Sequence, residues 1–215
     1  MAAYYQPARA VGGDFYDFVE FSDGRLGLIV GDVTDKGVPA AMVMATTRAI
    51  LRGAAERLVS PGQVLERVNE LLCPDIPLNM FVTCLYTLLD PASGRLQYAN
   101  AGHNLPCRRS KDGIDELRAT GMPLGLMPGM TYEEKETTLA PGESILLYSD
   151  GLVEAHDPQR EMFGFPRLRG LLASHPGGAA LIDFLLDKLA EFTGAEWEQE
   201  DDVTFVTLER TEKAA

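Results

Sequence analysis

The alternation of apolar and polar positions divides the chain into strands, turns and helices. Apolar alternation predicts strands at residues 81–89 and 95–99, and the Pro- and Gly-containing segment 90–94 between them predicts a hairpin turn. Short apolar runs predict further strands at 28–30, 143–148 and 203–209. The run at 28–30 is followed by Gly31 and Asp32, so a carboxylate lies at the exit of a buried strand. Such a group is costly to bury unless a partner compensates its charge.

Apolar residues at helical spacing predict three helices. The segment 38–58 carries one apolar face, and Pro39 suits its first turn. Ser60 and Pro61 predict the N-cap and first turn of a second helix, which continues to about Leu72. A late amphipathic helix is marked by Leu181, Ile182, Leu185, Leu186 and Leu189. Two consecutive helices among hairpin-linked strands favour an α+β fold with antiparallel sheet over repeated βαβ units.

Composition narrows the class of protein. The chain has 215 residues, 46% of them hydrophobic, and no long Gly/Pro-rich linker, which predicts a single domain over residues 1–215. A net charge of -13 without Lys/Arg clusters argues against a nucleic-acid partner. The apolar runs are too short for a membrane segment, and the start MAAYYQPARA is unlike a signal peptide. Three scattered cysteines fit a reducing cytoplasm.

Four acids share one context, a Gly or Asp neighbour beside an apolar strand: Asp14, Asp32, Asp150 and Asp201. Gathered at one end of a sheet core, they would raise one another's pKa. A pair of hard divalent cations removes that cost with oxygen ligands alone, which matches the lack of His and Cys clusters. Two such ions, bridged by Asp32, could share a hydroxide and polarise a phosphoryl oxygen for hydrolysis. Taken singly, an Asp after a strand is more commonly a turn former or helix cap, so this alternative stays open.

Six stretches carry a family resemblance: QPARAVGGDFYDF, GDVTDKGVPAAMVMA, LQYANAGHNLP, GMPLGLMPG, LLYSDGLVEA and EDDVTFVTL. In this order, from about residue 5 to 208, they resemble the PPM-type metal-dependent serine/threonine phosphatases of the bacterial SpoIIE-like or RsbU-like branch. The resemblance implies a four-layer α-β-β-α sandwich with two antiparallel sheets and a centre of two Mn²⁺ or Mg²⁺ ions. It also implies hydrolysis of phosphoserine or phosphothreonine on a protein.

The resemblance also assigns site residues. Asp32 would bridge both metals, and the carbonyl of Val33 would bind one of them. Asp14 would hold the second ion, directly or through water, while Asp150 and Asp201 complete the first; Asp32 and Asp150 are the expected catalytic centre. Asp201 is preferred to Asp202 because it takes the first place in the DDxT pattern. Arg9, shortly before Asp14, is either a phosphate-binding arginine or an ordinary surface residue.

The general acid is left open. Eukaryotic relatives carry a histidine two places after the bridging Asp, and this chain has Thr34 there, so metal-bound water, Asp35 or His103 would supply the proton. A lone histidine is more commonly structural, and Asn104 is expected to satisfy backbone groups in the AGHN turn. Lys36 would either meet a phosphate or, as the simpler expectation, neutralise Asp35 on the surface.

The resemblance names a substrate class as well. In this branch the usual substrate is a phosphorylated STAS-domain anti-sigma factor antagonist. Members are commonly regulated by sensor regions and by dimerisation, so the chain is expected to be the catalytic part of a longer protein or a stand-alone enzyme controlled by partners. Two alternatives remain: a catalytically silent module that binds a STAS or anti-sigma partner, and a phosphohydrolase acting on small molecules.

Overall fold

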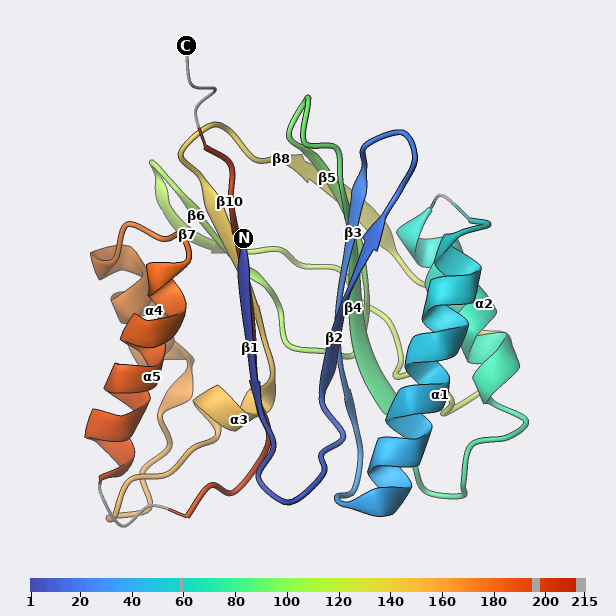
Figure 1. Ribbon diagram of the computed structural model, residues 1–215, viewed down its shortest axis with the longest axis horizontal. Helices are drawn as coiled ribbons and strands as arrows, with labels where there is room; N and C mark the ends of the chain where they lie inside the picture. Colours follow the sequence, from blue (N-terminus) through green and yellow to red (C-terminus); the bar gives the residue numbers. More distant parts are fainter. Residues whose placement is uncertain (59, 195–197, 212–215) are drawn as a thin grey trace.

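The computed structural model describes residues 1–58, 60–194 and 198–211 of the chain. Two five-stranded sheets lie face to face, and helices cover both outer faces (Figure 1). The strand order is β1-β10-β9-β6-β7 in the first sheet and β2-β3-β4-β5-β8 in the second. In the described residues, every pair of neighbouring strands in both sheets is antiparallel. The predicted α-β-β-α sandwich is therefore confirmed.

The elements of each sheet come from distant parts of the chain. The first sheet contains β1 (Ala2–Gln6), β6 (Cys107–Ser110), β7 (Gly113–Glu116), β9 (Ser144–Tyr148) and β10 (Val203–Glu209). The second contains β2 (Phe15–Glu20), β3 (Leu26–Val33), β4 (Val82–Leu89), β5 (Arg95–Ala101) and β8 (Glu134–Thr138). Helices α4 (Gly164–Ser174) and α5 (Ala180–Thr193) cover the first sheet, and α1 (Val38–Ala55) and α2 (Pro61–Leu72) cover the second. A short helix, α3 (Asp150–Val153), follows β9. None of the helices in these described ranges combines the length and apolar character needed to cross a membrane.

Three apolar layers hold the four layers of structure together. Side chains of α1 and α2 pack on the outer face of the second sheet, and those of α4 and α5 pack on the first. A third cluster fills the space between the sheets. Leu28 and Val30 belong to this central cluster, whereas Ile29 faces α1 and α2. Successive residues of a strand point to opposite faces, so a strand covered on both faces is apolar without interruption.

The structure moves several predicted boundaries. Helix α1 ends at Ala55 instead of residue 58, because the backbone N–H groups of Arg57 and Leu58 both bond to the carbonyl of Ala54 in a turn. Strand β4 starts at Val82, since both backbone groups of Phe81 bond to Thr34. Ser60 caps α2 as predicted and accepts a hydrogen bond from the Gln63 N–H at 3.4 Å.

Candidate active site

Four strand ends meet at one end of the sandwich, at the lower edge in Figure 1 where the β1–β2 loop and α3 lie. In the second sheet, Asp14 directly precedes β2 and Asp32 is the penultimate residue of β3, and these strands pair through Phe15 and Gly31. In the first sheet, β9 leads through Ser149 into Asp150, while Asp201 lies just before β10. The four candidate acids therefore come from two sheets and face one region.

A side-chain bond joins the two sheets at this point. The hydroxyl of Thr204 on β10 donates to a carboxylate oxygen of Asp14 at 2.6 Å, and both groups are buried. The hydroxyl of Ser149 accepts from the Thr204 N–H at 3.0 Å and holds the chain just before Asp150. The sequence interpretation missed both residues, although Thr204 is the Thr of the DDxT pattern and so carried a signal. These hydroxyls fix the carboxylates that approach from opposite sheets.

The acids act on one another electrostatically. Burial, and then the charge of Asp32, raise the pKa of Asp14 well above that of a free aspartate. Burial and the charges of Asp150 and Asp201 raise the pKa of Asp32 to about 7. Burial, Asp201 and Glu154 raise the pKa of Asp150 to about 6. All three shifts have the direction expected for like charges in a shared, partly dehydrated space.

Asp201 and Asp202 have different surroundings. Asp202 is 7% exposed, and its side chain accepts from the backbone N–H groups of Ala8 at 2.8 Å and Asp14 at 3.2 Å. It therefore holds the β1–β2 loop in place. Asp201 is more exposed, and its charge raises the pKa of both Asp32 and Asp150. The charge of Asp202 also raises the pKa values of Asp32 and Asp14. The choice of Asp201 as a metal ligand therefore stays a prediction.

Glycines let the loops of the site approach closely. A Cβ on Gly13 would stand 2.7 Å from the carbonyl oxygen of Val33, the backbone group expected to bind a metal. A Cβ on Gly151 would stand 2.0 Å from the carbonyl oxygen of Asp202. Any side chain at either position would push the acid-bearing segments apart, which explains glycine in GGD and SDG.

Lys36 does not pair with Asp35, so that expectation is wrong. Its ammonium group lies 2.9 Å from a carboxylate oxygen of Asp201 and also donates to the carbonyl of Glu200. Asp35 has a positive φ of 74° and accepts from the Lys36 N–H, which turns the backbone so that the lysine crosses to the β10 side. The lysine therefore contacts one of the candidate ligands.

Arg9 lies at the rim of the site. It is exposed and lines a cavity of about 350 Å³ with Ala8, Glu198, Gln199 and Glu200. The neighbouring Ala8 N–H is bound by Asp202, so the arginine is anchored close to the acids through the backbone. Both interpretations of Arg9 stay predictions.

The AGHN turn is held by a different residue from the one expected. The Asn100 side chain accepts from the His103 N–H at 2.7 Å and donates to the His103 carbonyl at 2.9 Å, which is the role foreseen for Asn104. His103 is 7% exposed, and burial lowers its pKa to about 4. A buried ring that is neutral near pH 7 is poorly suited to protonate a leaving group. This argues against His103 among the three candidates for the general acid.

The donor types fit a hard divalent cation: several carboxylates and a backbone carbonyl, with mutually raised pKa values that a cation would reverse. Within residues 1–58, 60–194 and 198–211, no three His, Cys, Asp or Glu side chains are already gathered at the spacing of metal ligands. The fit accordingly rests on the chemistry of the donors and on their shared location.

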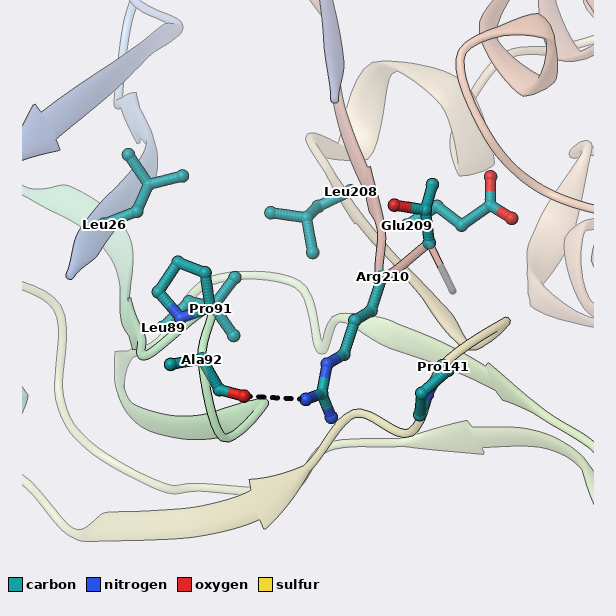
Figure 2. Close-up of a pocket in the computed structure, with 9 residues that line it drawn as sticks. Leu26, Leu89, Pro91, Ala92, Pro141, Leu208, Glu209 and Arg210 are labelled. Carbon is teal, nitrogen blue, oxygen red and sulfur yellow. Dashed lines mark hydrogen bonds between the residues drawn. The ribbon is translucent and has the colours of Figure 1, made fainter. Parts of the chain in front are cut away.

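A second cavity, of about 620 Å³, lies at the opposite end of the sandwich (Figure 2). Its lining is mainly aliphatic, from Leu26 at the start of β3, Leu89 at the end of β4 and Leu208 near the end of β10. Arg210 donates to the carbonyls of Leu139 at 2.7 Å and Ala92 at 3.0 Å, and so joins two turns. Among the described residues that line this cavity, Glu209 is the one acid, in contrast to the several acids of the first site.

Comparison with known proteins decides the family. A family model described as stage II sporulation protein E (SpoIIE) matches residues 22–211. The chain belongs to the SpoIIE family. The SpoIIE-family chain is 29% identical over 211 residues to the phosphoserine phosphatase RsbU of Bacillus subtilis, covering 95% of this chain and 61% of RsbU. It is 30% identical over 237 residues to protein IcfG of Synechocystis sp., covering 97% of this chain and 37% of IcfG. The chain thus spans less than two thirds of these curated relatives.

The fold of this SpoIIE-family chain agrees with a solved phosphatase domain. The SiaA-PP2C domain of Pseudomonas aeruginosa superposes with a TM-score of 0.86 at 25% identity, covering 97% of this chain and 85% of that domain. The chain is therefore a PPM-type phosphatase domain of the SpoIIE/RsbU branch, and the resemblance inferred from its motifs is confirmed.

Proposed function

We propose that this chain hydrolyses phosphoserine or phosphothreonine on a protein with the help of two divalent cations, Mn²⁺ or Mg²⁺. The observation that carries the proposal is the meeting of four carboxylates from two sheets, three of them with raised pKa values, on a SpoIIE-family fold. Among the described residues, the ion pair of Lys36 with Asp201 is the one salt bridge that these four acids make. Their like charges are therefore poorly compensated there, and added cations would stabilise them.

The roles of the residues follow from their places. Asp32 lies between the acids of both sheets, so it would bridge the ions, with the Val33 carbonyl beside it. Asp14, oriented by Thr204, would hold one ion, and Asp150 and Asp201 the other. When bound, the ions would activate water and polarise the phosphoryl group. Arg9 at the rim would bind phosphate oxygens through its planar guanidinium group.

The substrate belongs to the same proposal. RsbU is named as a phosphoserine phosphatase, which supports a phosphorylated protein as the substrate class. Within that class we propose a phosphorylated STAS-domain anti-sigma factor antagonist, met in the cytoplasm by a monomer or homodimer of the SpoIIE-family protein. The net charge of -13 would repel a phosphoprotein at long range, so recognition would depend on local contacts and on the charge of the bound ions.

Phosphate release from a phosphorylated STAS protein, measured with Mn²⁺, tests the proposal. Chelation should abolish release, and Asp32→Asn should lower it on the order of 10³-fold, because several kcal/mol of metal-derived stabilisation are lost. Asp23→Asn is a matched control, since Asp23 pairs with Arg25 at 2.7 Å in the β2–β3 turn, far from the acids.

The outcomes separate the alternatives. Release that survives both chelation and Asp32→Asn would reject the metal-dependent phosphatase. Partner binding without release at any Mn²⁺ concentration would show a silent binding module instead. Faster turnover of phosphorylated metabolites than of the phosphoprotein would show a small-molecule phosphohydrolase.

A further inference from the structure

His103, which is not one of the clustered acids, has a fixed backbone and a buried side chain. It follows β5 in the turn that Asn100 closes, and Asn100 itself is 1% exposed. Because Asn100 binds both the N–H and the carbonyl of His103, the backbone at this residue is fixed from two sides. The imidazole ring consequently has little freedom, and it is directed into the protein, with 7% of the residue exposed.

One side of the ring contacts the strand that pairs with Asp32. The His103 Nδ1 atom lies 2.9 Å from the hydroxyl oxygen of Thr83 on β4. Thr83 is the residue opposite Asp32 in the β3–β4 register, and its hydroxyl lies 3.4 Å from the Asp32 carbonyl oxygen. The ring is thus one side chain away from the backbone of the acid at the centre of the site.

The other ring nitrogen has no partner of this kind. The Nε2 atom is buried and makes no hydrogen bond within the part of the chain that the structure describes. The hydrogen bond of Nδ1 therefore ties the ring to β4, the strand that pairs with β3 at Asp32.

We infer that His103 is a positioning residue that fixes Asp32 near the end of β3, acting through Thr83 on the neighbouring strand β4. The inference rests on the proposed function, because this placement matters only if Asp32 holds bound cations. Groups that orient metal ligands, without binding the metal, commonly change metal affinity when they are replaced. The ring is buried behind Thr83, so the role assigned to it is one of placement and not of proton transfer to substrate.

The direct test is the affinity of the metal-free protein for Mn²⁺, measured by calorimetry. His103→Ala should raise the dissociation constant on the order of 10–100-fold, since Thr83, and through it Asp32, loses its support. His103→Gln, which keeps a donor and an acceptor, should restore part of the affinity. At saturating Mn²⁺ the KM for phosphoprotein should stay unchanged, because His103 contacts no substrate.

Thr83 supplies an independent arm if His103→Ala does not fold. Thr83→Val keeps the shape and removes the hydroxyl, so it should weaken Mn²⁺ binding, whereas Thr83→Ser should not. If both residues act through one contact, the double variant His103→Ala/Thr83→Val should weaken binding no more than the stronger single variant. Fully additive losses would overturn the inference.

His175→Ala is the matched control. His175 stacks on Phe184 with ring centroids 4.7 Å apart and accepts from the Gly177 N–H, in the region of α4 and α5. Its replacement should leave Mn²⁺ affinity unchanged. Tight Mn²⁺ binding by folded His103→Ala would overturn the positioning role while leaving the proposed function intact. A wild-type protein that binds no Mn²⁺ would overturn both.

Discussion

Two buried acids on the same short segment, Asp14 and Asp17, have opposite environments. Asp17 on β2 is 5% exposed, and its carboxylate bonds to Arg48 at 3.0 Å and lies 3.3 Å from the Arg52 Nε on α1. Asp14 is 2% exposed and is surrounded by the charges of Asp32 and Asp202 and by neutral hydroxyl groups. One acid is neutralised by the protein itself, and the other is left for a cation from outside.

This difference separates a structural acid from a candidate ligand. A carboxylate with a double arginine partner ties a helix to a sheet and has little remaining capacity for a metal. A carboxylate beside other carboxylates destabilises the metal-free fold and gains from any cation that enters. The motif GGDFYD thus contains one acid of each kind, and only Asp14 has the glycine neighbour that marked it as a candidate ligand in the sequence.

The largest expected effect is on the pH dependence of stability. The folded-state pKa of Asp32 is raised to about 7, above the value of about 4 for a free aspartate, so the folded protein binds the extra proton more tightly. Its contribution to stability is complete below about pH 4 and is lost as the pH rises towards 7, by a few kcal/mol at about 1.4 kcal/mol per pKa unit. Urea unfolding of the metal-free protein at several pH values measures this loss of stability.

Asp32→Asn is the reference for this measurement. The wild type should lose stability relative to the variant as the pH rises, and saturating Mn²⁺ should reverse the trend for the wild type. If the stability of the two proteins changed with pH in parallel, the charge of Asp32 would be compensated within the protein, as that of Asp17 is. The contrast between a structural acid and the acids of the site would then be wrong.

Replacing the two acids of the motif should have different effects on the stability of the metal-free protein. Asp17→Asn breaks charge-assisted hydrogen bonds and should cost about 2 kcal/mol, or roughly 4–8 °C in melting temperature. Asp14→Asn removes a buried repulsion and should leave the metal-free protein as stable as the wild type or more so. Thermal melting with and without Mn²⁺ measures both effects.

The response to metal distinguishes the acids further. The Asp17→Asn protein should keep the rise in melting temperature on adding Mn²⁺, and the Asp14→Asn protein should lose most of it. Equal responses of the two variants would contradict the division of the motif into a structural acid and a ligand.

The smallest expected effect concerns Lys36. Its ion pair with Asp201 joins side chains that are 34% and 43% exposed, so it contributes about 1 kcal/mol or less. Lys36→Ala frees Asp201 and removes a positive charge, so it should tighten Mn²⁺ binding up to about fivefold. Lys135→Ala, which breaks a similar exposed pair with Glu133, should leave the affinity for Mn²⁺ unchanged. Weaker Mn²⁺ binding by Lys36→Ala would show that the lysine orients Asp201 instead of competing for it.

The sequence predicted the parts of the fold that carry a strong local pattern. Helices α1 and α2, the β4–β5 hairpin and β10 have clear periodicity or turn residues, and the structure confirms them within a few residues. Strand β8, EKETT, is mostly exposed at the sheet edge and has no apolar alternation that would identify it. Helix α4 begins with Gly164-Phe165-Pro166 and lacks a side-chain cap, so its start carries no helix signal either.

The site residues, like the elements of the fold, were predictable only where the local sequence carries a signal. The four acids were visible because glycine or aspartate accompanies each of them at a strand end, in motifs shared with a family. The partners that orient them were not, because Thr83 lies opposite Asp32 only through strand register and Thr204 meets Asp14 only where two sheets face each other. The target of Lys36 likewise depends on a contact across 165 positions of chain, from residue 36 to residue 201.

The central claim is that carboxylates of both sheets enclose the same divalent cations. Anomalous diffraction from crystals grown with Mn²⁺ tests it most directly. We predict two adjacent peaks between Asp14, Asp32, Asp150 and Asp201, with the Val33 carbonyl beside one of them. Crystals that take up Mn²⁺ only elsewhere, or not at all, with these four carboxylates free of metal, would contradict the account.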